Sequence, residues 1–327
     1  MNSNVKHELL KRLFEANGAP ISGQEFADEY GLSRTAIWKY IKEFEEEGYE
    51  IASIRKKGYV LLSSPDRINA ANIQQHLKTD HYGKIIHYYE SCPSTQLIAH
   101  DAAQANADDG TLFVAEEQTA GKGRMSRPWN SAAQKGIWMS IVIRPSLMPH
   151  QAPQMTLVAA VAIVRAIEEL TGIEPTIKWP NDIMISGKKM TGILTELQAD
   201  PDRVKAIILG IGMNVNQTEE DFPIELKSIA TSLRLEGGQV VDRSRLIAEI
   251  LYYLELYTTM YEKHGFSPIK LLWESYANIE GKRIRAVMLN ETIEGSAIGI
   301  SDDGLLELKM DDGAVRAIFS ADIEIKK

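Results

Sequence analysis

The segment QTAGKGRMSRPW, residues 118–129, combines glycines with positive charge. Gly121 and Gly123 let the backbone come close to a ligand. The cations around them are Lys122, Arg124 and Arg127. Such a loop is suited to bind a phosphate group, although the GxxxxGK[ST] pattern of a P-loop is absent. An ordinary solvated loop is the alternative interpretation, so the other polar stretches have to decide between the two.

A second polar stretch, KWPNDIMISGKKMTGIL, begins at residue 178. Lys178 ends an apolar run, and Asn181 and Asp182 follow a Trp-Pro pair in a rigid polar corner. Lys189 stands on the returning segment. Buried charge at such a corner suggests ligand binding, while a tight hairpin alone would also explain the Pro-Asn-Asp sequence.

Two shorter stretches add neutral hydrogen-bonding groups. LGIGMNVNQ, residues 209–217, has glycines that permit close backbone approach, followed by Asn214 and Asn216. SCPSTQ, residues 91–96, puts Ser94 and Thr95 at a predicted helix start, where hydroxyls and free N–H groups receive polar ligand groups. The four stretches together are far more specific than any one of them.

The bulk composition excludes several other classes of protein. The 327 residues are 44% hydrophobic and 25% charged, which is the balance of a soluble globular protein of two or three domains. No apolar run reaches the roughly 20 residues of a membrane span, and no secretory signal is recognisable, so we expect a cytoplasmic protein. Cys92 is the single cysteine and the seven histidines form no HxxxH pair, so we expect neither a disulfide nor a protein metal site. We interpret Cys92 as a small buried apolar residue rather than a nucleophile.

Residues 1–65 predict a DNA-binding unit. Helical spacing near 5–16, 22–30 and 34–48 gives three helices, with small Ala27, Gly31 at the turn and apolar Ile37 as in a helix-turn-helix. The two alternating runs around RKKG predict a β-hairpin, and therefore a winged helix. The residues expected to face DNA are Ser33, Arg34, Thr35, Lys39, Arg55, Lys56 and Lys57. Because the segment has nine Lys/Arg against ten Asp/Glu, DNA binding depends on the placement of the charges. The alternative is a module that serves protein contacts or is vestigial.

After the linker SSPDRINA, strands and helices alternate irregularly. We predict strands at 84–90, 111–118, 136–144, 174–179, 182–187, 190–198 and 205–214, and helices at 95–106, 151–171, 242–263 and 267–276. The hairpin at 182–197 favours a mixed sheet backed by helices. The short strands and DDG turns near the end predict a small β-barrel. The expected fold is therefore α+β and multidomain: winged helix-turn-helix over 1–65, a mixed-sheet catalytic domain over 66–276, and an SH3-like barrel over 277–327.

The order of Ser-Thr-Gln, GKGRxxRxW, KWPND, KKxxGIL and GIGMNVN resembles the biotin protein ligases. With its winged helix, the chain is similar to the bifunctional form of that family, which also represses biotin genes. The resemblance covers essentially the whole chain. It implies a mixed-sheet domain of the biotin/lipoate ligase type, with biotin and ATP as substrates and Mg²⁺ carried by the nucleotide. In that family the glycine-arginine loop is disordered until ligand arrives, and then folds over biotin and the adenylate.

The resemblance also implies roles for individual residues. For biotin they are Ser94, Thr95, Gln96, Gln118, Lys122, Gly123, Arg124 and Lys189, with Trp129 and Trp138 beside its apolar body. For ATP and the adenylate they are Gly121, Lys122, Arg124, Arg127, Lys178, Asn181 and Asn214. The implied catalytic residues are Arg124, Lys189 and Asp182, with Asp182 as base or as structural cap of the hairpin. Lys122 departs from the family, in which this position is arginine, and a lysine keeps the charge but loses the planar fork.

The implied reaction forms biotinoyl-5'-AMP and then transfers biotin to a lysine of the biotin carboxyl carrier protein. With the adenylate bound, a homodimer would bind a symmetric operator in DNA. Two alternatives stay open at this point. Lipoate or octanoate transfer shares the catalytic architecture, and a transcription factor could sense a small molecule through a ligase domain without catalysis.

Overall fold

The computed structural model describes residues 3–64, 66–288 and 290–326. The chain divides into two compact units, one made of residues up to 77 together with 242–245, the other of residues 78–241 and 246–327. None of the helices in the described ranges is both long and apolar enough to cross a membrane.

The first unit is a winged helix-turn-helix. Its elements are α1 (Ser3–Glu15), α2 (Gly23–Glu29), α3 (Arg34–Glu46), β1 (Glu50–Ile54), β2 (Gly58–Ser63) and α4 (Ala70–Gln74). The predicted turn is confirmed, because Ala27 and Ile37 are fully buried and Gly31 has a φ of 64°. The Ser33 hydroxyl accepts a hydrogen bond from the Ala36 N–H, which makes Ser33 the predicted N-cap of α3.

The hairpin β1–β2 forms the predicted wing, and residues 55–57 make its tip. Gly58 closes the tip with a φ of 117°, and an added Cβ there would lie 1.8 Å from the Ile21 carbonyl oxygen. Ile21 forms a backbone bridge to Tyr59, which attaches the wing to the segment before α2. A glycine at position 58 is therefore required by both its backbone conformation and its packing.

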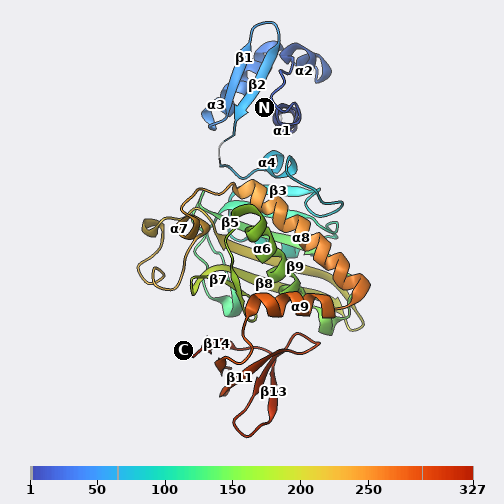
Figure 1. Ribbon diagram of the computed structural model, residues 1–327. Helices are drawn as coiled ribbons and strands as arrows, with labels where there is room; N and C mark the ends of the chain where they lie inside the picture. The colour runs from blue at the N-terminus through green and yellow to red at the C-terminus, as the bar shows by residue number, and fades with distance from the viewer. Residues whose placement is uncertain (1–2, 65, 289, 327) are drawn as a thin grey trace. The chain divides into compact units, whose positions relative to one another are not determined.

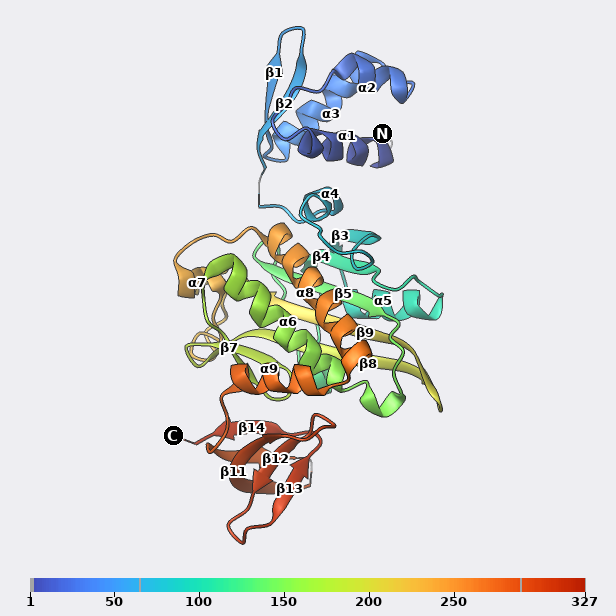
Figure 2. The ribbon, with the colours of Figure 1, turned by 45° about the vertical axis from the view of Figure 1, so that its right-hand side comes forward.

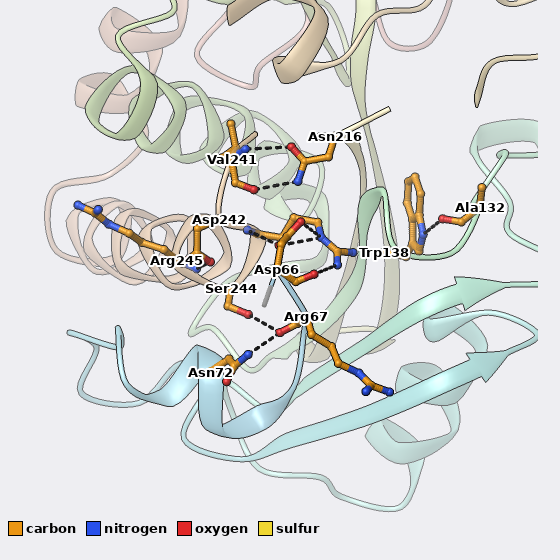
Figure 3. Close-up of polar contacts among 11 residues, drawn as sticks. Asp66, Arg67, Asn72, Ala132, Trp138, Asn216, Val241, Asp242, Ser244 and Arg245 are labelled. Atoms are coloured by element: carbon orange, nitrogen blue, oxygen red, sulfur yellow. Dashed lines mark hydrogen bonds and ion pairs between the residues drawn. The ribbon is translucent and has the colours of Figure 1, made fainter. Parts of the chain in front are cut away.

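Residues 66–72 are anchored by an ion pair and hydrogen bonds. Arg243 is fully buried, its Nε lies 3.0 Å from an Asp66 carboxylate oxygen, and an Nη donates to the Asp66 carbonyl oxygen at 2.8 Å. The Arg67 carbonyl oxygen accepts from Ser244 and Asn72 (Figure 3). Asp66 of the predicted linker thus forms a partly buried ion pair with Arg243, 177 positions away in sequence.

A seven-stranded mixed sheet forms the centre of the second unit. Its strands are β3 (Ile86–Cys92), β4 (Leu112–Gln118), β5 (Gly136–Ile143), β6 (Thr176–Lys178), β7 (Asp182–Ile185), β8 (Lys188–Asp200) and β9 (Arg203–Asn214). The order is β3-β4-β5-β9-β8-β7-β6, and β3–β4 is the parallel pair among otherwise antiparallel ones. The prediction of a mixed sheet is confirmed.

Helices cover the two faces of this sheet. The helices are α5 (Thr95–Gln104), α6 (Gln154–Thr171), α7 (Leu233–Gly237), α8 (Arg243–His264) and α9 (Ser267–Ala277). Figures 1 and 2 show α6, α8 and α9 together on one face. Thr156 of α6 hydrogen-bonds Thr195 on that side, whereas α5 packs against Phe113, Val142 and Ile208, whose side chains point to the opposite face.

The C-terminal part is β-rich, as predicted. It contains β10 (Arg283–Val287), β11 (Thr292–Ile300), β12 (Leu306–Lys309), β13 (Val315–Ile318) and β14 (Asp322–Ile325). The five antiparallel strands follow the order β13-β12-β11-β10-β14. This arrangement brings the start of β14 to the loop that contains Arg127.

Candidate active site

A cavity of about 340 Å³ lies on the α5 face of the seven-stranded sheet. Most of the predicted ligand residues line it: Ser94, Thr95, Gln96, Gln118, Lys122, Gly123, Arg124, Arg127, Asn181, Asp182, Lys189 and Asn214. Lys178 lines a smaller neighbouring hollow, and Gly121 lies in the turn of the loop. Trp138 is completely buried, is not part of this lining among the described residues, and donates to the Ala132 carbonyl oxygen (Figure 3).

One end of the cavity is made of neutral hydrogen-bonding groups. The Gln118 side-chain oxygen accepts from the N–H and the hydroxyl of Thr95, at 2.9 and 3.1 Å. The Thr95 hydroxyl also lies 2.9 Å from that of Ser140, which donates to Gln96. Because these groups fix one another, they form a preorganised site for an uncharged polar ligand group. The sequence did not reveal Ser140, since it is an ordinary polar position inside an apolar strand.

The glycines of β9 make room for protein side chains. An added Cβ on Gly212 would lie 2.5 Å from the Trp129 indole nitrogen, and one on Gly210 would lie 2.4 Å from a Gln96 oxygen. Trp129 therefore packs over the strand and forms one wall of the cavity. The sequence suggested that a ligand approaches the backbone of these glycines. In the structure the Trp129 indole lies against Gly212 instead.

The opposite end of the cavity is charged. The Lys189 ammonium lies 2.6 Å from an Asp182 carboxylate oxygen and 5.2 Å from the centre of the Trp129 ring. The Arg124 guanidinium donates to the Asn181 side chain at 3.1 Å and to the Ser320 hydroxyl at 2.7 Å. Burial lowers the pKa of Arg124. A partly buried guanidinium and an ammonium that line the same cavity can stabilise developing negative charge strongly, because little water screens them.

The glycine-arginine loop is folded back on itself. The Gly123 N–H donates to the Arg127 carbonyl oxygen at 2.8 Å, and the Trp129 N–H donates to that of Gly121 at 2.9 Å. Met125 and Ser126 take left-handed backbone conformations, with φ of 55° and 57°. Non-glycine residues rarely adopt such values, so the tip of the loop carries local strain.

The segment 217–231 completes the cavity, and no sequence pattern pointed to it. The Lys189 N–H donates to the Ile229 carbonyl oxygen at 2.8 Å, and the Thr231 N–H donates to that of Lys189 at 3.0 Å. The Gln217 side-chain oxygen and the Trp129 indole nitrogen are among the buried polar atoms that have no hydrogen-bond partner in the described residues. Both residues line the cavity, which fits a site completed by a polar ligand.

Cys92 is buried, and burial raises the pKa of its thiol. A thiol in this environment stays protonated and is a poor nucleophile.

The residues predicted to contact DNA are all exposed in the first unit. Four other cations of the winged helix, Lys6, Lys11, Arg12 and Lys42, are paired with glutamates. In the described part of this unit, Arg34, Lys39 and the three basic residues of the wing tip form no ion pair. In this part of the unit, no acidic side chain therefore lies within ion-pair distance of these five cations.

Comparison with known proteins agrees with this architecture. A family model described as "Biotin/lipoate A/B protein ligase family" matches residues 88–214, "HTH domain" matches 6–60, and "Biotin protein ligase C terminal domain" matches 280–326. These matches define the class as protein ligases of the biotin and lipoate type that carry a helix-turn-helix domain.

The chain is 49% identical to "Bifunctional ligase/repressor BirA" of Bacillus subtilis (strain 168), over 99% of this chain and 100% of that one. It is 26% identical to the protein of the same name from Escherichia coli (strain K12), over 95% and 94%. The solved "Biotin protein ligase from Aquifex aeolicus in complex with biotin and ATP" superimposes with a TM-score of 0.64 at 30% identity, covering 75% of this chain and 99% of that one. The chain therefore belongs to the family of bifunctional biotin ligases and repressors.

Proposed function

We propose that this protein joins biotin to ATP to form biotinoyl-5'-AMP, transfers the biotinoyl group to a lysine of the biotin carboxyl carrier protein, and represses biotin genes when the adenylate is bound. Membership in the bifunctional family supports both activities. The observation that carries the proposal is the polarity of the cavity, which has neutral hydrogen-bonding groups on its β5 side and charged groups on its β7–β8 side.

The neutral end suits the ureido head of biotin. Thr95, Gln118 and Ser140 offer both donors and acceptors in a fixed arrangement, as an uncharged ureido group requires. Trp129 supplies an apolar wall for the bicyclic body. The carboxylate of a biotin bound in this direction would point toward Arg124 and Lys189 at the charged end. Substrate orientation and charge stabilisation would then be provided by opposite ends of the same cavity.

The first step needs charge stabilisation more than covalent chemistry. A carboxylate oxygen of biotin attacks the α-phosphorus of ATP, and negative charge develops on the phosphoryl oxygens. Arg124 and Lys189 are suited to neutralise this charge, and Lys122 adds a third cation from the loop. Mg²⁺ carried by ATP would supply further neutralisation of its phosphates. Asn181 holds the Arg124 guanidinium at this end of the cavity.

The second step needs an uncharged amine. A lysine side chain has an unperturbed pKa of about 10.4, so the acceptor lysine must lose a proton before it attacks the mixed anhydride. Asp182 lines the cavity and is suited to accept or orient that proton. Its ion pair with Lys189 also supports the alternative role, in which Asp182 positions the ammonium.

The first unit would bind operator DNA. Arg34 and Lys39 lie at the exposed N-terminal half of α3, which suits a recognition helix in the major groove. The cations of the wing tip would contact neighbouring phosphates. The absence of ion pairs at these five residues, in the part of the unit that the structure describes, supports DNA over a protein partner.

The direct test is incorporation of labelled biotin into the carrier domain by the full-length protein. We expect ATP-dependent labelling, with biotinoyl-5'-AMP detectable when the carrier is omitted. Lipoate and octanoate are offered in parallel, and preferential transfer of either acid would contradict the biotin assignment. If neither adenylate nor labelled carrier forms, the ligase proposal is wrong and a non-catalytic sensor is supported instead.

A further inference from the structure

Trp38 lies on α3 with a large part of its ring in solvent. Of the five tryptophans, all of which lie in the described ranges, it alone is exposed, at 50% of its surface. The buried stripe of the same helix consists of Ile37, Tyr40, Ile41 and Phe44. A tryptophan outside this stripe serves neither the core nor the helix, because tryptophan has a lower helix propensity than lysine, arginine or glutamate.

Cations flank the exposed ring. Arg34 precedes Trp38 by four residues and Lys42 follows it by four, so both are its neighbours on the helix surface. The Lys42 ammonium lies 6.0 Å from the centre of the ring, which is a weak cation–π contact. Lys39 is adjacent in sequence, and in the described part of the unit neither Lys39 nor Arg34 forms an ion pair. The ring therefore belongs to a largely positive surface.

This surface is poorly suited to an apolar protein partner. In the part of the first unit that the structure describes, Trp38 is the one large hydrophobic side chain exposed on a helix. The other two exposed ones, Ile54 and Leu62, lie on the strands of the wing. Protein interfaces are marked by contiguous apolar patches. A single apolar ring among cations instead fits a ligand that combines negative charge with an isolated apolar group.

The major groove of DNA offers this combination. Phosphates follow one another along each strand, and the C5-methyl group of thymine is the apolar group among the base edges. Apolar side chains, including the aromatic ring of phenylalanine, distinguish thymine by contact with this methyl group. Residues in the N-terminal part of a recognition helix reach the base edges, and Trp38 lies in the N-terminal half of α3.

We propose that the Trp38 ring contacts a thymine methyl group in the operator, so that the protein selects a T·A pair at the position that Trp38 faces. Trp38 is then a specificity-determining residue, and its contact is apolar rather than ionic. This inference rests on the proposed DNA binding, and it deepens that proposal by naming a base that the recognition helix selects.

The test removes the methyl group and the ring, separately and together. The full-length protein, with biotin and ATP, is titrated by fluorescence anisotropy with an operator duplex from upstream of the biotin genes. Each thymine is replaced in turn by deoxyuridine, which lacks the methyl group but keeps the base pairing. We expect at least one replacement to weaken wild-type binding about fourfold, the effect of burying one methyl group. Trp38→Ala should weaken binding of the unmodified duplex by at least as much, and should be insensitive to that replacement.

Two further variants show whether the contact is apolar and local. Trp38→Phe keeps an aromatic ring and should retain sensitivity to the same methyl group. Leu62→Ala is the matched control, since Leu62 is 65% exposed in the same unit but lies on β2. It should bind every duplex as the wild-type protein does. In Trp38→Ala the slope of log K against log salt concentration should stay unchanged, because no phosphate contact is lost.

The proposal is wrong if no thymine replacement weakens wild-type binding, a result that does not depend on whether Trp38→Ala folds. A Trp38→Ala variant that stays sensitive to the same replacement would also overturn it. A wild-type protein that does not bind the operator at all would instead contradict the DNA-binding function itself, and this inference with it. The two failures are therefore distinguishable.

Discussion

Lys189 is held from three directions before any ligand binds. Asp182 pairs with its ammonium, the Trp129 ring lies beneath it, and its backbone is bonded to the segment 229–231. A cation fixed in this way needs little reorganisation when negative charge develops nearby. The same arrangement gives Asp182 two potential tasks, positioning Lys189 and receiving a proton from the acceptor lysine.

Asp182→Asn separates these tasks. Loss of a general base typically costs about 10² to 10⁴-fold in rate, so we expect transfer from preformed adenylate to the carrier to slow by at least about 100-fold. Single-turnover transfer of labelled biotin measures this step directly. Asp200→Asn is the control, because Asp200 is paired with Lys205 elsewhere on the sheet. Unchanged transfer by Asp182→Asn would leave Asp182 with a structural role only.

Gly212→Ala tests the wall of the cavity. The new Cβ would lie within 2.5 to 3.1 Å of three indole atoms of Trp129, so the ring must move away from the strand. We expect KM for biotin to rise about tenfold, equivalent to about 1.4 kcal/mol of binding free energy. Tryptophan fluorescence would report the displacement.

Gly237→Ala is the comparison for this substitution. At position 237 an added Cβ would meet only the flexible end of the Ile173 side chain, at 3.0 Å. It should change neither KM for biotin nor the fluorescence. Normal biotin kinetics in Gly212→Ala would show that Trp129 does not shape the biotin site.

At the scale of elements, the wing is a rigid hairpin whose tip carries three positive charges. Gly58 and the bridge between Ile21 and Tyr59 fix where residues 55–57 point. Each phosphate contact contributes about −0.9 to the slope of log K against log salt concentration. The salt dependence of operator binding therefore measures the number of phosphate contacts, and the wing's share is the part lost when its cations are removed.

Replacing Arg55, Lys56 and Lys57 together by glutamine should reduce the magnitude of that slope by about 2 to 3. Operator affinity measured from 50 to 200 mM salt, by fluorescence anisotropy, gives the slope. Lys42→Gln is the control, since Lys42 lies in the same unit but is paired with Glu45. An unaltered slope in the triple variant would exclude phosphate contacts by the wing.

Regular elements were predictable from the sequence where their periodicity is strong. The apolar run of α6 and the alternation in β8 and β9 gave their type and nearly their bounds. The five-residue helices α4 and α7 were missed, because one turn leaves no periodic pattern. The strand order was not predictable either, since it depends on pairing between distant segments.

The candidate site was predictable where polar residues cluster along the chain. KWPND and the glycine-arginine loop are visible as local patterns, and the structure brings most of their polar residues to one cavity. Ser140 and the segment 217–231 reach that cavity through strand register and long-range packing, which no local pattern encodes. The β9 glycines predicted that some group approaches the strand closely, but not which one. That group is Trp129, which is 83 positions before Gly212 in the sequence.

At the scale of the whole molecule, one ligand would control two activities. If the adenylate binds more tightly to a dimeric, DNA-binding form, mass action shifts the protein toward that form. The size of this effect is limited by the difference in adenylate affinity between the two forms.

We expect biotin and ATP together to increase the dimer fraction in sedimentation experiments and to tighten operator binding at least about tenfold, within the usual range of allosteric coupling. Biotin alone and ATP alone are the controls, and each should have a smaller effect. Operator affinity that is indifferent to both ligands would contradict the repressor proposal.

The ion pair between Asp66 and Arg243 also sets an order of events during synthesis. The partners are 177 residues apart, and a chain grows at about 5 to 20 residues per second. The helix-turn-helix and its wing are therefore complete on the ribosome for about 10 to 35 s before Arg243 has been added. During that interval Asp66 is a solvated carboxylate without its Arg243 partner, and the nascent DNA-binding domain is independent of the enzyme whose adenylate would control it.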